Sequence, residues 1–137
     1  MIMKSRLTVA RGPHSATVLI VDDDSGARAT ACRTLKLAGF QVREAGDGAS
    51  ALRILQQHPR EIWLVLAELM TPGMSGTELA ERVLAAPSRP LVLLMSDCPR
   101  KELDRMVGFP LELPYLRKPL VPEQLTARVQ ELRARSV

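Results

Sequence analysis

Aromatic residues are scarce in this chain of 137 residues, and that scarcity excludes one class of function. They make up only 3% of the sequence, too few for a platform on which nucleic-acid bases stack. The net charge of +4 does not reverse this conclusion, because the basic residues are scattered over segments expected to face outward. We expect a solvated basic surface and no nucleic-acid binding by the chain itself. The scattered basic residues include Arg28, Arg33, Lys36, Arg43 and Arg53.

Cysteines and long apolar runs are also few. Cys32 and Cys98 are the only cysteines and do not have the spacing of metal ligands, so we expect two core thiols in a reducing, cytoplasmic setting. No apolar run is long enough to cross a bilayer. The charges near Met1 are not followed by the apolar segment of a secretory signal. Membrane association is therefore not expected.

The chain has instead a regular alternation of strand-like and helix-like segments. Three continuous apolar runs predict strands buried on both faces, as in a parallel sheet: Thr17–Val21, Ile62–Ala67 and Leu91–Met95. An alternating edge strand is predicted over 40–45, and a last strand over 113–118, where Pro114 favours an edge position or a later start. Apolar spacing and capping residues predict helices over 25–38, 48–57, 77–85, 100–107 and from Pro122 onward. Five strand–helix units predict an α/β fold with a doubly wound parallel sheet.

Chemically active side chains follow four of these strands at the point where each strand ends. An acidic run, Asp22–Asp24, follows the first strand, and Glu68 follows the central one. Ser96 and Lys118 end two later strands. The carboxyl ends of parallel strands meet at one edge of the sheet, where ligands of such folds bind. We therefore expect carboxylates, a hydroxyl and an ammonium to lie together there.

This combination resembles the receiver domain of two-component response regulators, over nearly the whole chain. The resemblance implies a flavodoxin-like (βα)5 sheet with strand order 2-1-3-4-5 and a receiver domain over 17–136. Residues 1–16 contain Gly12-Pro13 and show no periodicity, so we expect a flexible lead-in or the end of a linker there. The short fourth helix resembles that of receivers allied to hybrid histidine kinases. The motifs that carry the resemblance are Val21-Asp22-Asp23, Met70-x-Pro72-Gly73-Met74-Ser75-Gly76, Ser96 and Tyr115-x-x-Lys118-Pro119.

The resemblance also implies a role for each pocket residue. Asp23 would bind Mg²⁺ directly and Asp22 through water, with Glu68 and the Met70 backbone carbonyl completing the protein ligands. Two further side chains would contact a phosphoryl group, and two would act as the switch. The phosphoryl-contacting residues are Ser96 and Lys118, the switch residues are Ser96 and Tyr115, and the Lys118–Pro119 bond is expected to be cis.

Glu68 departs from the family pattern, because the phosphate acceptor at this position is an aspartate. No aspartate lies between Asp47 and Asp97 that could take its place. The extra methylene adds roughly 1.5 Å of reach, and a misplacement of about 1 Å can cost on the order of 100-fold in transfer rate. Glu68 could instead imitate a phosphorylated acceptor in part, with one negative charge against about two.

Asp97, where the family has a small residue, would crowd or repel a phosphoryl group. Both departures predict a pseudo-receiver with weakened or absent Mg²⁺ binding; a phosphorylation-competent receiver is the alternative.

Several residues also have simpler interpretations. The acids at 22–24 could merely cap a helix, and Tyr115 could be a half-buried tyrosine whose hydroxyl contacts water. Asp22 with Ser96 and Lys118 also resembles a haloacid-dehalogenase-type phosphohydrolase. That class needs a later acidic motif, and only two glutamates of the last helix remain, Glu123 and Glu131, so we expect no enzyme.

The expected partner is a histidine kinase, a phosphotransfer protein or another signalling protein. It would dock near the last strand and helix, around Tyr115, by analogy with the family. A homodimer is an open alternative.

Overall fold

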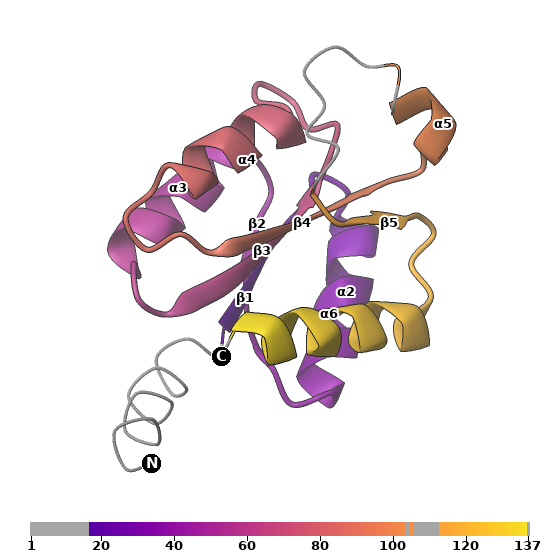
Figure 1. Ribbon diagram of the computed structural model, residues 1–137, viewed down its shortest axis with the longest axis horizontal. Helices are drawn as coiled ribbons and strands as arrows, with labels where there is room; N and C mark the ends of the chain where they lie inside the picture. Colours follow the sequence, from indigo (N-terminus) through magenta and orange to yellow (C-terminus); the bar gives the residue numbers. More distant parts are fainter. Residues whose placement is uncertain (1–16, 104, 106–112, 137) are drawn as a thin grey trace.

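The computed structural model describes residues 17–103, 105 and 113–136, and its described part is a five-stranded parallel sheet covered by helices (Figure 1). The strand order β2-β1-β3-β4-β5 confirms the predicted α/β fold. The strands are β1 (Thr17–Val21), β2 (Gln41–Ala45), β3 (Ile62–Glu68), β4 (Leu91–Ser96) and β5 (Tyr115–Arg117). The helices are α2 (Ser25–Leu37), α3 (Gly48–Gln57), α4 (Gly76–Leu84), α5 (Arg100–Leu103) and α6 (Pro122–Ser136). The expected lead-in over 1–16 lies outside the described residues.

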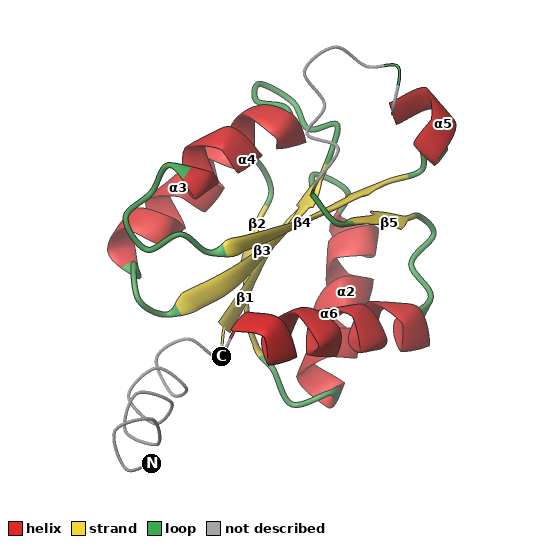
Figure 2. Cartoon of the chain, viewed as in Figure 1, coloured by secondary structure: helices red, strands yellow, loops and turns green. Residues whose placement is uncertain are grey.

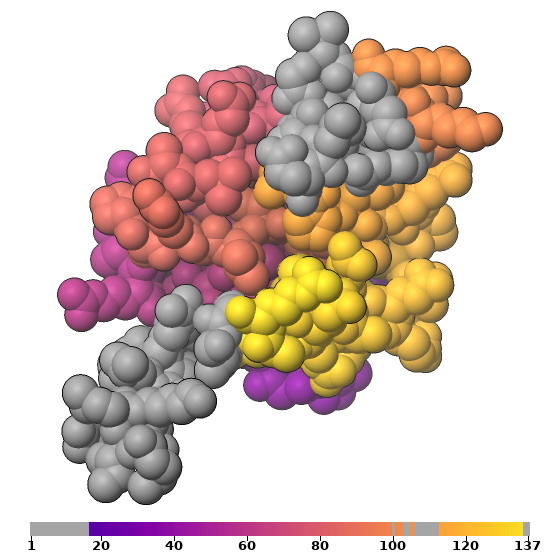
Figure 3. All heavy atoms as spheres, viewed as in Figure 1, coloured from indigo at the N-terminus to yellow at the C-terminus, as the bar shows by residue number. Residues whose placement is uncertain are grey.

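Two apolar layers hold the helices against the two faces of the sheet. Helices α3 and α4 cover one face, while α2 and α6 cover the other (Figure 2). Every residue of β1 and β3 is buried, as their continuous apolar runs predict. In the space-filling view, α6 in yellow lies against atoms of α2 in purple (Figure 3). The α6 side chains in the core are Leu125, Val129 and Leu132.

Side chains that cap the first turn start three of the helices. Asp24 accepts hydrogen bonds from the backbone N–H groups of Gly26 and Ala27 at the start of α2. Asp47 and Ser75 cap α3 and α4 in the same way. Such side chains satisfy backbone donors that have no partner inside the helix. The strand-to-helix connections at the carboxyl edge of the sheet are thus fixed by local hydrogen bonds.

The structure corrects three details of the sequence-based predictions. The strand β5 begins at Tyr115 rather than at 113, because Pro114 cannot donate a ladder hydrogen bond. Cys98 is only half-buried, whereas Cys32 lies in the core as expected. Helix α5 ends at Leu103, short of the predicted 107, and residues 104, 106 and 107 lie outside the described part of the chain. In that described part, no helix is long and apolar enough to cross a membrane.

Candidate functional site

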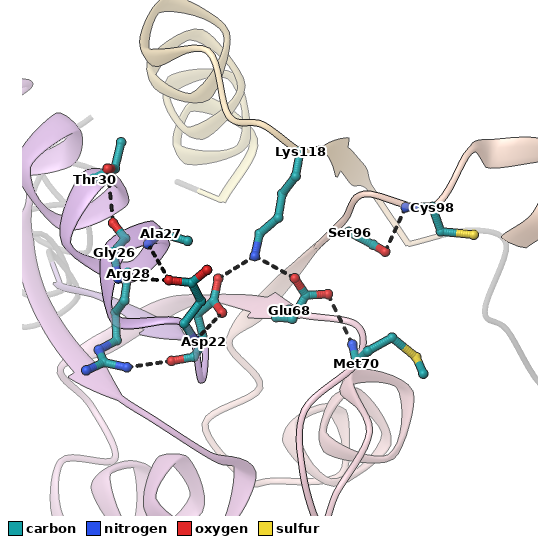
Figure 4. A network of polar contacts seen from close by, with 11 residues as sticks. Asp22, Gly26, Ala27, Arg28, Thr30, Glu68, Met70, Ser96, Cys98 and Lys118 are labelled. Carbon is teal, nitrogen blue, oxygen red and sulfur yellow. Dashed lines mark hydrogen bonds and ion pairs between the residues drawn. The ribbon is translucent and has the colours of Figure 1, made fainter.

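The carboxyl edge of the sheet brings together the side chains that the strand ends were predicted to deliver. The pairing register aligns Val21 of β1 with Ala67 of β3, so Asp22 and Glu68, the next residues, emerge side by side. Lys118 follows β5 and reaches toward both of them (Figure 4). Its peptide bond to Pro119 is cis, as predicted. Residues 96 positions apart in sequence thus meet at one point.

Lys118 lies between the two carboxylates. Its Nζ is 2.7 Å from Asp22 Oδ2 and 2.6 Å from Glu68 Oε1. The three side chains are well shielded from solvent, with exposed fractions of 16% for Lys118, 1% for Asp22 and 10% for Glu68. Burial lowers the pKa of Lys118, but the bonds to Asp22 and Glu68 outweigh it, so the pKa lies above its ordinary value. We call Asp22, Glu68 and Lys118 the pocket cluster.

The remaining carboxylate oxygens of the pocket cluster are held by the backbone. Asp22 Oδ1 accepts a hydrogen bond of 3.0 Å from the Asp24 N–H, and Glu68 Oε2 accepts one of 3.1 Å from the Met70 N–H. All four oxygens therefore have a protein partner. The longer side chain of glutamate makes this possible, since one oxygen reaches Lys118 while the other turns back to its own loop.

Two residues that support the pocket were not found by sequence reasoning. Arg28 was expected to face outward, yet its guanidinium donates a hydrogen bond of 2.6 Å to the Asp22 carbonyl and pairs with Glu44. Gly76 allows the loop to fold back on β3, because a Cβ there would lie 2.6 Å from the Glu68 carbonyl oxygen. The Gly76 in the loop motif was a usable signal for this close approach. No periodic pattern marks Arg28, since its role depends on one side-chain conformation.

The acidic run at 22–24 divides into three environments. Asp24 is the helix cap, and its hydrogen bonds from Ala27 and Gly26 hold its pKa below the ordinary value. The capping interpretation is therefore correct for Asp24. Asp22 is fully buried in the pocket cluster, while Asp23 is exposed.

Ser96 and Tyr115 are linked to each other beside the pocket. Ser96 is 1% exposed, and its Oγ accepts a hydrogen bond of 3.0 Å from the Cys98 N–H. The Tyr115 hydroxyl donates to the backbone carbonyls of Ser96, at 3.0 Å, and of Cys98. Burial raises the pKa of Tyr115. Of the two interpretations left open for Tyr115, a hydroxyl that only contacts water does not agree with the structure, because the loop after β4 folds back and supplies backbone acceptors.

The pocket has a volume of about 600 Å³, and five of its eleven lining residues are acids. Among its described lining residues, Lys118 carries the positive charge against five carboxylates. Asp97 is an exposed lining residue, and the Met70 side chain is 65% exposed. Ser96 and Tyr115 do not line the pocket. The charged lining residues are Asp22, Asp23, Asp24, Glu68, Asp97 and Lys118.

A comparison with protein families identifies the family of this chain. A family model described as the response regulator receiver domain matches residues 18–130. The chain belongs to this family. Receiver domains are signalling rather than catalytic modules, so the phosphohydrolase alternative is set aside. Receiver domains interact with histidine kinases.

Individual relatives agree with this assignment. The receiver domain is 34% identical over 115 residues to the sensory transduction protein RegX3 of Mycolicibacterium smegmatis, covering 83% of this chain and 49% of that protein. It thus spans about half the length of the curated relatives it matches. It is also similar to the receiver domain of the hybrid histidine kinase CckA, with 27% identity, a TM-score of 0.70 and coverage of 84% and 96% of the two chains. A receiver domain from Clostridium thermocellum, 23% identical, shares the fold with a TM-score of 0.76 over 88% and 95% of the two chains.

The receiver family typically binds Mg²⁺, but the donor set observed here does not fit that ion. Mg²⁺ needs several oxygen ligands in near-octahedral positions. Within residues 17–103, 105 and 113–136, no three acidic, histidine or cysteine side chains are grouped so as to hold a metal ion. Lys118 lies between Asp22 and Glu68, where a shared cation would bridge them.

Proposed function

We propose that this receiver domain is a pseudo-receiver, a module of phosphorelay signalling whose pocket is set by its own side chains rather than by phosphorylation. The observation that carries the proposal is the state of Glu68 at the acceptor position. Its Oε1 is paired with Lys118 and its Oε2 with the Met70 N–H. A nucleophilic carboxylate needs an oxygen free to attack in line, and placement matters within about 1 Å.

The charge of the pocket supports the same proposal. A phosphoryl donor would approach through a mouth that contains the exposed Asp23 and Asp97. Phosphoryl transfer depends on neutralising negative charge, and Lys118 is already paired with two carboxylates. Incoming phosphate would therefore meet net negative charge.

Intact-mass measurement after incubation with acetyl phosphate and Mg²⁺ tests the proposal. We expect no phosphoryl mass on the wild type and a gain on Glu68→Asp, whose shorter side chain cannot hold both present partners. Glu68→Gln is the matched control, because a gain shared with it must lie at another residue. A phosphoryl mass on wild-type Glu68, located by peptide mapping, would overturn the proposal in favour of a phosphorylation-competent receiver.

We further propose that partners dock on the surface formed by β5, α5 and α6 around Tyr115. The partner would be a histidine kinase, a phosphotransfer protein or a second copy of the chain, in the cytoplasm. The prolines at 99 and 110, which leave room for only a short helix between them, support a kinship with receivers of hybrid histidine kinases. Tyr115→Ala should weaken partner capture, with Leu84→Ala as control, because Leu84 is an exposed residue of α4 on the opposite face of the sheet from α6. If both variants bind a kinase as wild type does, the surface lies elsewhere.

A further inference from the structure

The cation of the receiver pocket is part of the chain itself. Two carboxylates with almost no exposed surface, Asp22 and Glu68, face one ammonium at 2.7 and 2.6 Å. Buried carboxylates are costly unless a counter-charge and hydrogen bonds compensate them. Lys118 supplies the charge, and the Asp24 and Met70 N–H groups supply the hydrogen bonds. Each oxygen of these two carboxylates therefore already has a partner within the chain.

A divalent ion would have to displace this arrangement. Mg²⁺ keeps several of its waters and gives them up reluctantly, whereas Asp22 offers a side chain that is only 1% exposed. An ion held directly by Glu68, as the predicted ligand set requires, would also lie next to the Lys118 ammonium, which is 2.6 Å from Glu68 Oε1, and two cations repel at such distances. The remaining acids do not compensate, because Asp24 is engaged as a helix cap. Of the predicted direct side-chain ligands, Asp23 alone is exposed.

We infer that Lys118 is the resident cation of this pocket and that it excludes Mg²⁺ from the wild-type chain. Glu68 is what makes the exclusion effective. Its extra methylene lets Oε1 reach Lys118 while Oε2 holds the Met70 N–H. An aspartate would end roughly 1.5 Å earlier and could keep only one of these partners. The inference rests on the proposed function for its account of Glu68, but it concerns cation binding and not phosphorylation.

Binding of Mn²⁺ measured by electron paramagnetic resonance tests the inference without a phosphoryl donor. Mn²⁺ shares the preference of Mg²⁺ for oxygen ligands, and its free signal falls when the ion is bound. We expect the wild type to leave the free signal unchanged at millimolar ion. Lys118→Met should bind one ion, at least about tenfold more tightly than wild type, because the competing charge is gone. Adding Asp22→Asn to that variant should abolish the binding again.

Glu68→Asp is the second variant, in case Lys118→Met folds poorly. It keeps Lys118 and should also gain one Mn²⁺ site. Arg43→Met, which removes a cation outside the pocket, should behave like the wild type. Stoichiometric Mn²⁺ binding by the wild type would overturn the inference, as would failure of both folded pocket variants to bind. A wild type that binds Mn²⁺ but gains no phosphoryl mass would overturn this inference alone, leaving the pseudo-receiver proposal intact.

Discussion

Two clusters of charge lie near opposite ends of β3 and have similar contact distances. The pocket cluster includes Glu68, the last residue of the strand. The other, which we call the surface cluster, consists of Glu61, immediately before the strand, with Arg43 and His58. Arg43 Nε is 2.6 Å from Glu61 Oε2, and His58 Nδ1 is 3.3 Å from Glu61 Oε1. By distance alone, the Arg43–Glu61 pair matches the pairs of Lys118.

The two clusters differ in their exposure to water. Side chains of the surface cluster are exposed by 39% for Arg43, 31% for Glu61 and 30% for His58. The corresponding values in the pocket cluster are 16% or less. Water and salt screen the surface cluster, so its charges contribute little to stability. The pocket charges were taken out of water at a cost, so removing one leaves the others uncompensated. Burial, rather than distance, decides what each cluster does.

The two clusters should differ most in the free energy of unfolding that is lost when the cation of each is removed. We expect Lys118→Met to lower the free energy of unfolding by about 3–5 kcal/mol, because Asp22 and Glu68 would face each other without a counter-charge. Arg43→Met should cost less than about 1 kcal/mol. Urea unfolding followed by circular dichroism measures both values. Adding Glu68→Gln to Lys118→Met should recover part of the loss; no recovery would mean that packing, and not charge, explains the cost.

The comparison also shows what the sequence could and could not predict. The fold followed from the apolar runs and caps, since burial of β1 and β3 on both faces leaves a continuous pattern in the sequence. The meeting of Asp22, Glu68 and Lys118 followed from parallel strands ending at one edge. Their pairing did not, because it depends on the side-chain conformation of Glu68 and on a lysine 96 positions from Asp22. Neither local spacing nor periodicity carries that information.

The same limit explains the residues that were misplaced. The sequence does not decide between a switch role and a hydroxyl in water for Tyr115, because the acceptors of its hydroxyl come from the loop after β4 and not from its own strand. Arg28 was assigned to the outside by helix periodicity, yet a long side chain can bend back over its own helix end to the Asp22 carbonyl. Periodicity locates the Cβ atom, whereas function here depends on the far end of the side chain.

The pH dependence of stability should also distinguish the two clusters, because the pocket cluster loses its contribution at alkaline pH and the surface cluster at acid pH. The pKa of Lys118 is raised above its ordinary 10.5. Its contribution is therefore fully present below about 10.5 and is lost as pH rises through the folded-state value. The hydrogen bond from Arg43 lowers the pKa of Glu61 from its ordinary 4.5. That contribution is present above about 4.5 and is lost as pH falls through the lowered value.

Urea midpoints measured against pH for the wild type and both single variants would check this. The difference in urea midpoint between wild type and Lys118→Met should become smaller at alkaline pH. The difference between wild type and Arg43→Met should become smaller at acid pH. Subtracting each variant from the wild type removes the titration of unrelated groups. If the difference in urea midpoint between wild type and Lys118→Met stays constant above the pKa of Lys118, the charge of the ammonium is not what stabilises the pocket.

Salt should produce the smallest effect and test the role of burial most directly. At about 1 M NaCl the screening length falls to about 3 Å, so exposed pairs lose most of their attraction while buried pairs are screened much less. The stability difference between wild type and Arg43→Met should shrink by a few tenths of a kcal/mol, which is most of what an exposed pair contributes. The difference for Lys118→Met should stay nearly constant over the same titration. If both differences in stability shrink in parallel, salt screens Lys118 as strongly as Arg43. The pocket charges would then behave like exposed charges, and burial would not explain the difference between the clusters.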